Sequence, residues 1–347
     1  MGCKLVLEDG MVFVGEGFGV SKTKIAEVIY HTGMVSYDEI LTNPIYSSKF
    51  VCMSYPLIGN YGIAMEDYEA KDVKIGGLIV REYNDAPSNF RSTMTLNEAM
   101  EENDVCGISG IDTRKLVRHL RDNGSLMGIL CDESITDEEC LAMISEYKIE
   151  NETEKVSTKK PWSSKTTNPT NNVVIIDLGV KRELAYQLNE YGCNVVVLPY
   201  NSTISTVNKY NPSGLIISDG PSDPNKETCV LELLESVNGK YPLLGLGMGA
   251  DVIAIFNGGN VTKTKTNYYG CNYPVRNLNN KVSIVNLNHS YTINDIKLEV
   301  THKAVIDDTT LGFRGNNVLG YKFLNEDVLK EFIEMMGGRN NAKKNRY

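Results

Sequence analysis

The chain has 347 residues, which is more than one ordinary domain needs and enough for two domains that each bury a core. Its formal net charge of −9 argues against nucleic acid or an anionic membrane as a main partner, because both attract basic surfaces. The eight cysteines form no C-x-x-C pair, so no metal site is predicted. No charged-then-apolar leader and no membrane-length apolar run is evident, and we expect a reduced, cytoplasmic protein.

The first 150 residues mix short strand-like runs with turn residues. The clearest strand-like runs are residues 3–7 and 75–80. One helix is predicted between Asp112, its N-cap, and Gly124, the glycine that ends it. The outer side of this helix carries three arginines, Arg114, Arg118 and Arg121. We interpret that side as a solvated face in preference to a docking surface, and we predict an α+β domain for this half.

A polar stretch at residues 151–172 separates the two halves. It carries two prolines and no apolar periodicity, which is typical of a linker. Trp162, the only tryptophan of the chain, lies within it, and we expect its ring to pin the linker against a domain surface. The sequence therefore predicts an N-terminal domain over residues 1–150 and a C-terminal domain over residues 173–347.

The C-terminal half alternates between strand-like and helix-like patterns. Its short apolar runs have the length of buried strands and occur at residues 173–176, 195–198, 215–217 and 243–246. The helical patterns occur at residues 184–191, 227–237 and 248–256. This alternation, with short links, predicts a mainly parallel, doubly wound α/β sheet whose ligand site lies at the carboxyl ends of the strands.

The chemistry is expected where the strand at residues 243–246 meets the helix at residues 248–256. Gly245 and Gly249 stand on either side of position 247, which is the layout of a nucleophile elbow. The position of the nucleophile holds Gly247, which has no side chain and can attack nothing. A phosphate-binding glycine loop has little support, because no acidic residue is evident about 20 residues further on and no P-loop occurs.

Two further segments have a distinctive composition, residues 218–224 (SDGPSDP) and residues 288–291 (NHSY). Together with the elbow they resemble class I glutamine amidotransferases, whose motifs read G-x-C-x-G, S-N-G-P-G-D-P and N-H-G-F. Three N-terminal segments resemble the small subunit of carbamoyl phosphate synthetase, namely residues 27–47, 88–91 and 111–116 (IDTRKL). The resemblance covers nearly the whole chain in order. It implies an N-terminal α+β small-subunit domain followed by an amidotransferase-like domain.

The chain departs from this family at the residues that hydrolyse glutamine. The resemblance places Gly247 at the nucleophilic cysteine and Leu324 at the histidine base, while Glu326 agrees with the family. No histidine follows His302, and no Cys, Ser or Thr lies at residues 243–253, so neither role has a neighbouring substitute. Loss of both members of a nucleophile–base pair leaves no ordinary route to hydrolysis.

The resemblance also implies a set of substrate-binding positions. They are Ser47, Gly220, Ser222, Met248, Asp251, Asn288, Ser290 and Tyr291. Met248 offers a backbone N–H to an oxyanion hole. Asp251 replaces a glutamine-binding Gln with a negative charge, and Ser222 and Ser290 add bulk where the family has glycine. We therefore expect glutamine binding to be impaired.

The resemblance implies a non-catalytic small subunit in a heterodimeric ligase. Its partner would be the large subunit of carbamoyl phosphate synthetase, which makes carbamoyl phosphate from bicarbonate, ATP and ammonia for arginine or pyrimidine biosynthesis. The ATP and metal sites would lie on that partner, so this chain would hold no cofactor. Two alternatives stay open, namely a repurposed, non-catalytic binding module and a working glutaminase with an unusual site.

Overall fold

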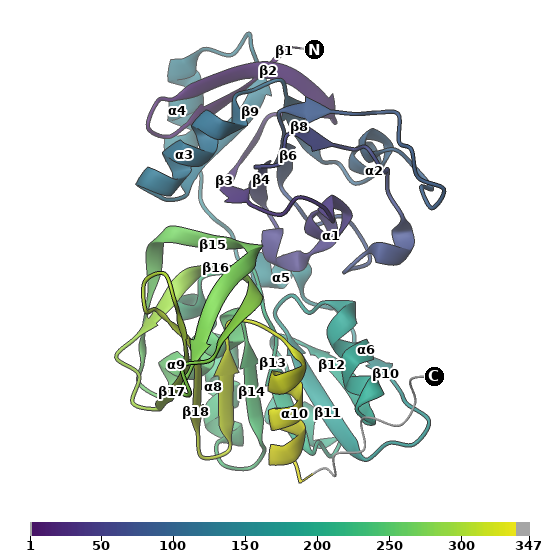
Figure 1. The fold of residues 1–347 in the computed structure, drawn as a ribbon, viewed down its shortest axis with the longest axis vertical. Helices are drawn as coiled ribbons and strands as arrows, with labels where there is room; N and C mark the ends of the chain where they lie inside the picture. Colours follow the sequence, from purple (N-terminus) through teal and green to yellow (C-terminus); the bar gives the residue numbers. More distant parts are fainter. Residues whose placement is uncertain (1, 338–347) are drawn as a thin grey trace. The chain divides into compact units, whose positions relative to one another are not determined.

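A computed structural model of the chain describes residues 2–337. The chain divides into two compact units (Figure 1). The first comprises Met1–Glu150 with Lys265–Gly270, and the second comprises Asn151–Thr264 with Cys271–Tyr347. The segment Lys265–Gly270 therefore belongs to the first unit although it lies far along the chain, and its Tyr269 is buried in a core of that unit.

The first unit is built on a closed β-barrel. Its strands, in order around the barrel, are β1 (Gly2–Leu7), β2 (Val12–Gly19), β8 (Cys106–Ser109), β6 (Gly77–Ile79), β4 (Lys49–Met53), β3 (Lys24–His31) and β9 (Leu126–Asp132). Alternate side chains of a strand point to opposite faces, and one of the resulting cores contains Leu5 and Leu7 of β1 with Leu130 of β9. The strand expected at residues 3–7 is thus confirmed.

Helices and short 3-10 turns accompany the barrel. They are α1 (Tyr37–Thr42), η1 (Pro44–Tyr46), η2 (Met65–Asp67), α2 (Leu96–Glu102), α3 (Thr113–Asn123) and α4 (Asp137–Glu146), and the short strands β5 (Leu57–Ile58) and β7 (Glu82–Tyr83) pair with each other. The predicted helix is confirmed as α3, because the Asp112 side chain accepts a hydrogen bond from Lys115 N–H at 3.0 Å and Gly124 ends the helix. The three arginines on the outer side of α3, Arg114, Arg118 and Arg121, are all exposed and are called the arginine stripe. Across residues 2–337, no helix is both long and apolar enough to cross a bilayer.

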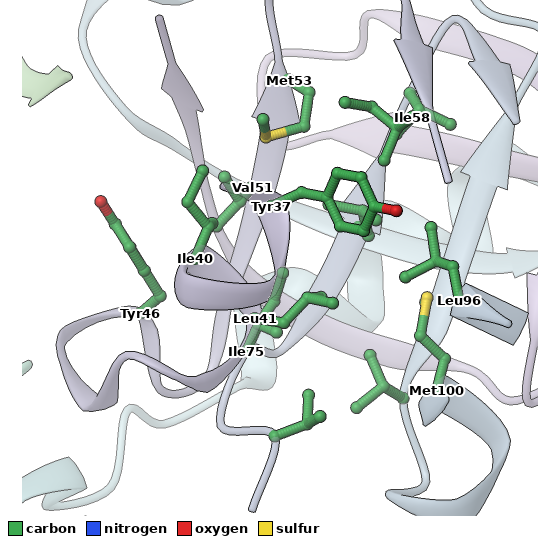
Figure 2. Packing of buried hydrophobic residues seen from close by; sticks show 14 of the residues in the cluster. Tyr37, Ile40, Leu41, Tyr46, Val51, Met53, Ile58, Ile75, Leu96 and Met100 are labelled. Atoms are coloured by element: carbon green, nitrogen blue, oxygen red, sulfur yellow. The ribbon is translucent and has the colours of Figure 1, made fainter. Parts of the chain in front are cut away.

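A second core of the first unit lies between the barrel and its short helices. Figure 2 shows the side chains of Tyr37 and Leu41 from α1, Val51 from β4, and Leu96 and Met100 from α2 in this cluster, and all of them are fully or almost fully buried. These apolar contacts position the short helix α1, which has too few residues to be stable in isolation.

The second unit contains a ten-stranded sheet (Figure 1). Its strand order is β10 (Trp162–Ser164), β12 (Cys193–Pro199), β11 (Asn171–Asp177), β13 (Gly214–Ile217), β14 (Leu243–Leu246), β19 (Val318–Tyr321), β18 (Thr310–Gly315), β16 (Val282–Asn294), β15 (Asn260–Asn277) and β17 (Glu299–Ala304). The strands from β12 to β19 pair in parallel. The pairs β10–β12, β19–β18, β18–β16, β18–β17 and β15–β17 are antiparallel. The predicted, mainly parallel core of this sheet is confirmed.

Helices cover both faces of the parallel strands. They are α6 (Arg182–Glu190), α7 (Ile204–Asn208), α8 (Thr228–Val237), α9 (Met248–Phe256) and α10 (Glu326–Met335), with the 3-10 turn η3 (Pro224–Lys226). On β13, Leu215 shares a core with α8 and α9, whereas a Cβ on the preceding Gly214 would lie 2.7 Å from the Phe332 ring of α10. Because adjacent strand residues face opposite sides, the sheet is doubly wound, as predicted.

The polar stretch at residues 151–172 contains regular structure in place of the expected linker. It forms α5 (Glu152–Val156) and the edge strand β10, in which Trp162 pairs with Val197 of β12. The Thr153 side chain is fully buried, yet it is held by hydrogen bonds and not by an apolar stripe. Sequence periodicity detects apolar burial, so it did not reveal this segment.

Candidate functional site

Gly247 forms the turn between β14 and α9, at the carboxyl end of the parallel strands. Its φ of 52° and ψ of −117° lie in a region that residues with side chains adopt only under strain. A Cβ on Gly245 would lie 2.6 Å from the Gly249 carbonyl oxygen, and a Cβ on Gly249 would lie 2.1 Å from that of Ile217. These glycines allow the close approach of strand and helix that a nucleophile elbow requires.

Asp219, from the loop after β13, fills the space into which a side chain at position 247 would project. A Cβ on Gly247 would lie 2.0 Å from Asp219 Cγ and 2.1 Å from its Oδ1. The same Oδ1 accepts hydrogen bonds from the backbone N–H groups of Met248 and Gly220, each at 2.8 Å. The carboxylate therefore occupies the kind of two-donor position that serves as an oxyanion hole in acyl-transfer enzymes.

Sequence reasoning missed the role of Asp219, although a signal was present. The matched loop motif, S-N-G-P-G-D-P, has Asn where this chain has Asp. Ser218 fixes the loop, because its Oγ accepts a hydrogen bond from Leu178 N–H and donates one to the Asp219 carbonyl oxygen, both at 2.9 Å. The loop conformation that places the carboxylate at the elbow is thus held by hydrogen bonds to a neighbouring strand end.

A buried ion pair lies beside the elbow, between Asp251 in the first turn of α9 and Lys322, which follows β19. Their side chains are 2% and 0% exposed, respectively. Asp251 Oδ1 has no hydrogen-bond partner among residues 2–337. Burial raises the pKa of Asp251 to about 6, an effect that Lys322 opposes and the nearby Asp219 carboxylate reinforces. Burial also raises the pKa of Asp219, against its two N–H donors and the charge of Lys322.

The resemblance assigns neither of the two histidines in the second unit to the family's base. His289 is buried with Nδ1 2.9 Å from the Tyr291 carbonyl oxygen, and burial lowers its pKa well below the usual value. The ring is therefore neutral, with Nδ1–H donating to that carbonyl. His302 packs edge-on against Tyr321 and Phe323, with ring centroids 5.4 Å apart in each case, and burial lowers its pKa as well.

The segment matched to the base carries no group that could move a proton at position 324. Leu324 is 36% exposed. Asn325 caps α10, its side chain accepting a hydrogen bond from Val328 N–H at 3.0 Å. Glu326, which agrees with the family, begins α10 and pairs with Lys330 at 2.9 Å. The local sequence thus serves to start a helix.

The Ser222 hydroxyl is used to hold α5. Its Oγ accepts a hydrogen bond from Thr153 N–H at 2.8 Å. It also lies 2.8 Å from Thr153 Oγ1, which in turn is 2.6 Å from Glu227 Oε1. Gly220 has no space for a larger residue, since a Cβ there would lie 2.5 Å from the Leu178 carbonyl oxygen. These two positions are therefore occupied by internal contacts.

The remaining predicted positions are distributed over both units. Asn288, Ser290 and Tyr291 lie on β16, and the Ser290 carbonyl oxygen accepts a hydrogen bond from Thr264 Oγ1 at 3.2 Å. Ser47 is buried in the first unit, after η1. Within residues 2–337 there is no group of three or more His, Cys, Asp or Glu side chains that could hold a metal ion.

Comparisons with known proteins agree on both halves of the chain. Residues 5–130 match the family described as carbamoyl-phosphate synthase small chain, CPSase domain, and residues 174–322 match glutamine amidotransferase class-I. The carbamoyl phosphate synthase small chain of Bacillus cereus is 39% identical over 317 residues, covering 90% of this chain and 86% of that one. The carbamoyl phosphate synthase pyrimidine-specific small chain of Bacillus subtilis is 39% identical over 316 residues, with the same coverage.

A glutamine amidotransferase of known structure from Thermotoga maritima is also similar to part of the chain. It is 19% identical, with a TM-score of 0.39, and the match covers 47% of this chain and 81% of that one.

Proposed function

This chain belongs to the carbamoyl phosphate synthase small-chain family, and we propose that it is a small subunit that has lost glutaminase activity. The observation that carries the proposal is Gly247 at the elbow with the Asp219 carboxylate in the space of the missing nucleophile. In this role the chain would support a large subunit that makes carbamoyl phosphate from bicarbonate, ATP and ammonia. We propose the cytoplasm as its compartment, with the product feeding pyrimidine or arginine biosynthesis.

The proposed loss extends to each chemical role at the site. Position 247 supplies no thiolate, and Leu324 supplies no base, so Glu326 alone is kept from the catalytic segment. Both members of the nucleophile–base pair are absent, and catalysis by such a pair is lost when either member is removed. The resemblance assigns Asp251 to a glutamine-binding position, and the buried ion pair of Asp251 with Lys322 supports impaired glutamine binding.

We predict that the purified protein releases glutamate from glutamine no faster than a heat-denatured control. The physical reason is that the elbow has no atom that can attack the carboxamide. The measurement is glutamate and ammonia release over hours, with the chain alone and with its large subunit. A protein-dependent rate with glutamate and ammonia in equal amounts would contradict the proposal and favour a glutaminase with an unusual site.

We also predict a stable complex with a carbamoyl phosphate synthase large subunit from the same source. A permanent interface buries more than about 2,000 Å² in total, so the complex is expected to survive gel filtration at micromolar concentration. The complex is expected to form carbamoyl phosphate from ammonia and not from glutamine. The full chain is the reagent to use, because Tyr269 packs in the first unit.

Charge reversal of the exposed stripe Arg114, Arg118 and Arg121 serves as an internal comparison, and we expect it to change co-elution little. Separate elution of the two full-length proteins would favour the repurposed binding module. The binding module would also be favoured if this chain does not change the rate at which the large subunit makes carbamoyl phosphate from ammonia.

A further inference from the structure

The Asp219 carboxylate is held at the elbow as a bound ligand would be. Met248 N–H and Gly220 N–H both donate to its Oδ1 over 2.8 Å. Met248 begins the nine-residue helix α9, whose N-terminal end attracts negative charge. Asp219 and Met248 are 29 residues apart. The N-cap residue Gly247 has no side chain that could cap the helix, so the contact from Asp219 is a tertiary contact and not a local cap.

We propose that the elbow is a carboxylate-binding site and that Asp219 is its internal ligand. The inference rests on the proposed loss of the nucleophile, because a Cβ at position 247 would overlap Asp219 Cγ. A carboxylate leaving water needs replacement donors, and two converging N–H groups supply them on one oxygen. The buried ammonium of Lys322 offsets part of the negative charge.

A second observation concerns the neighbouring acid group, Asp251. The Asp219 carboxylate adds to the burial that raises the pKa of Asp251, and Asp251 Oδ1 is buried without a hydrogen-bond partner among residues 2–337. In the wild-type protein Asp219 Oδ1 occupies both converging N–H groups, so this site becomes available to a carboxylate from solution only when Asp219 is removed.

The size of the released space specifies the ligand. Asp219→Ala removes a carboxylate and keeps its Cβ, which leaves room for formate. Asp219→Gly removes the CH₂ group as well, which leaves room for acetate. The class of ligand is thus a small monocarboxylate, and the two variants should differ in which one they prefer.

The test is chemical rescue of these variants, read as thermal unfolding of the full chain. We expect Asp219→Ala to unfold at a lower temperature than wild type, and formate to raise that temperature saturably by about 2–4 °C per kcal/mol of stabilisation recovered. Acetate is expected to act likewise on Asp219→Gly. Sodium chloride at the same ionic strength should not raise the unfolding temperature of either variant. The unfolding temperature of the wild type should respond to neither carboxylate.

Two further variants make the result specific. Asp223→Ala removes a carboxylate of the same loop, one that caps η3 through Asn225, and should lose stability without rescue. Gly247→Ala in the Asp219→Ala background puts a methyl group into the released space and should abolish rescue. Equal responses of wild type, Asp223→Ala and Asp219→Ala to formate would overturn the proposal, as would an Asp219→Ala protein as stable as wild type.

If Asp219→Ala does not fold under any condition, the stability of Asp219→Asn is measured in its place. This variant keeps the oxygen that accepts hydrogen bonds from both N–H groups. Retention of most of the stability supports the internal ligand, and a loss as large as that of Asp219→Ala overturns it. Rescue is measured without any glutaminase assay. If no carboxylate rescue is observed, the proposed loss of glutamine hydrolysis is unaffected. Glutamine hydrolysis by the wild type, by contrast, would refute the proposed function itself.

Discussion

Gly247→Cys is expected to leave glutamine hydrolysis undetectable and to lower the free energy of unfolding by roughly 2–6 kcal/mol. The strained backbone contributes about 1–3 kcal/mol, because φ is 52° at this position. Overpacking contributes about another 1–3 kcal/mol, because the new Cβ would lie 2.0 Å from Asp219 Cγ. Denaturant unfolding measures the loss, and a glutaminase assay on the same sample measures activity.

Gly239→Ala is the matched control for this effect. Gly239 also has a positive φ, 71°, but apart from its chain neighbours no atom of residues 2–337 lies within 4 Å of the position of its Cβ, so only backbone strain applies. Combining Gly247→Cys with Asp219→Gly should recover the overpacking share of the loss, and a double-mutant cycle isolates it. Equal losses for the two glycines, or strict additivity with Asp219→Gly, would show that Asp219 does not block position 247.

This prediction changes how glutamine hydrolysis could be built into the chain. The resemblance, in which proline follows the histidine base, suggests the repair Gly247→Cys with Leu324→His, Asn325→Pro and Asp251→Gln. The structure adds Asp219, whose side chain has to leave the elbow before a thiol can occupy it. A four-residue repair that retains Asp219 is therefore expected to remain inactive.

Lys322→Met is expected to cost about 3–5 kcal/mol, because it leaves Asp251 buried and without its counter-charge. Lys322 lowers the pKa of Asp251, which burial has already raised to about 6. Its removal should therefore raise that pKa further. A carboxyl group with a raised folded-state pKa binds its proton more tightly when folded, so the variant should gain stability as the pH falls from about 7 towards 5.

Lys330→Met provides the comparison on an exposed pair. Lys330 and Glu326 are a helical i,i+4 pair with side chains 31% and 71% exposed, and such a pair contributes about 0.3–0.5 kcal/mol. Replacing both buried partners, as in Lys322→Met with Asp251→Leu, should cost less than Lys322→Met alone. If the two single lysine variants are equally stable, the Asp251–Lys322 pair is not the buried charge pair described above.

Local patterns in the sequence determined the family and the elbow with a glycine at its centre. Glycines two residues on either side of position 247, after an apolar run and before a helical one, specify a sharp strand–turn–helix whatever surrounds it. The helix between Asp112 and Gly124 was equally readable, since its N-cap and terminal glycine act within a few residues. The proposed assignment of Leu324 to the position of the base needed only motifs that match the family in order.

Only the tertiary structure decided which side chains lie beside Gly247 and Asp251. Asp219 reaches a donor 29 residues away, and Asp251 pairs with Lys322 across 71 residues, so neither contact leaves a periodic trace in the sequence. The same reason explains the structure found at residues 151–172, where Thr153 is fixed by side chains of Ser222 and Glu227. Hydrogen bonds and ion pairs between distant residues depend on where the fold brings them, and that information is absent from local spacing.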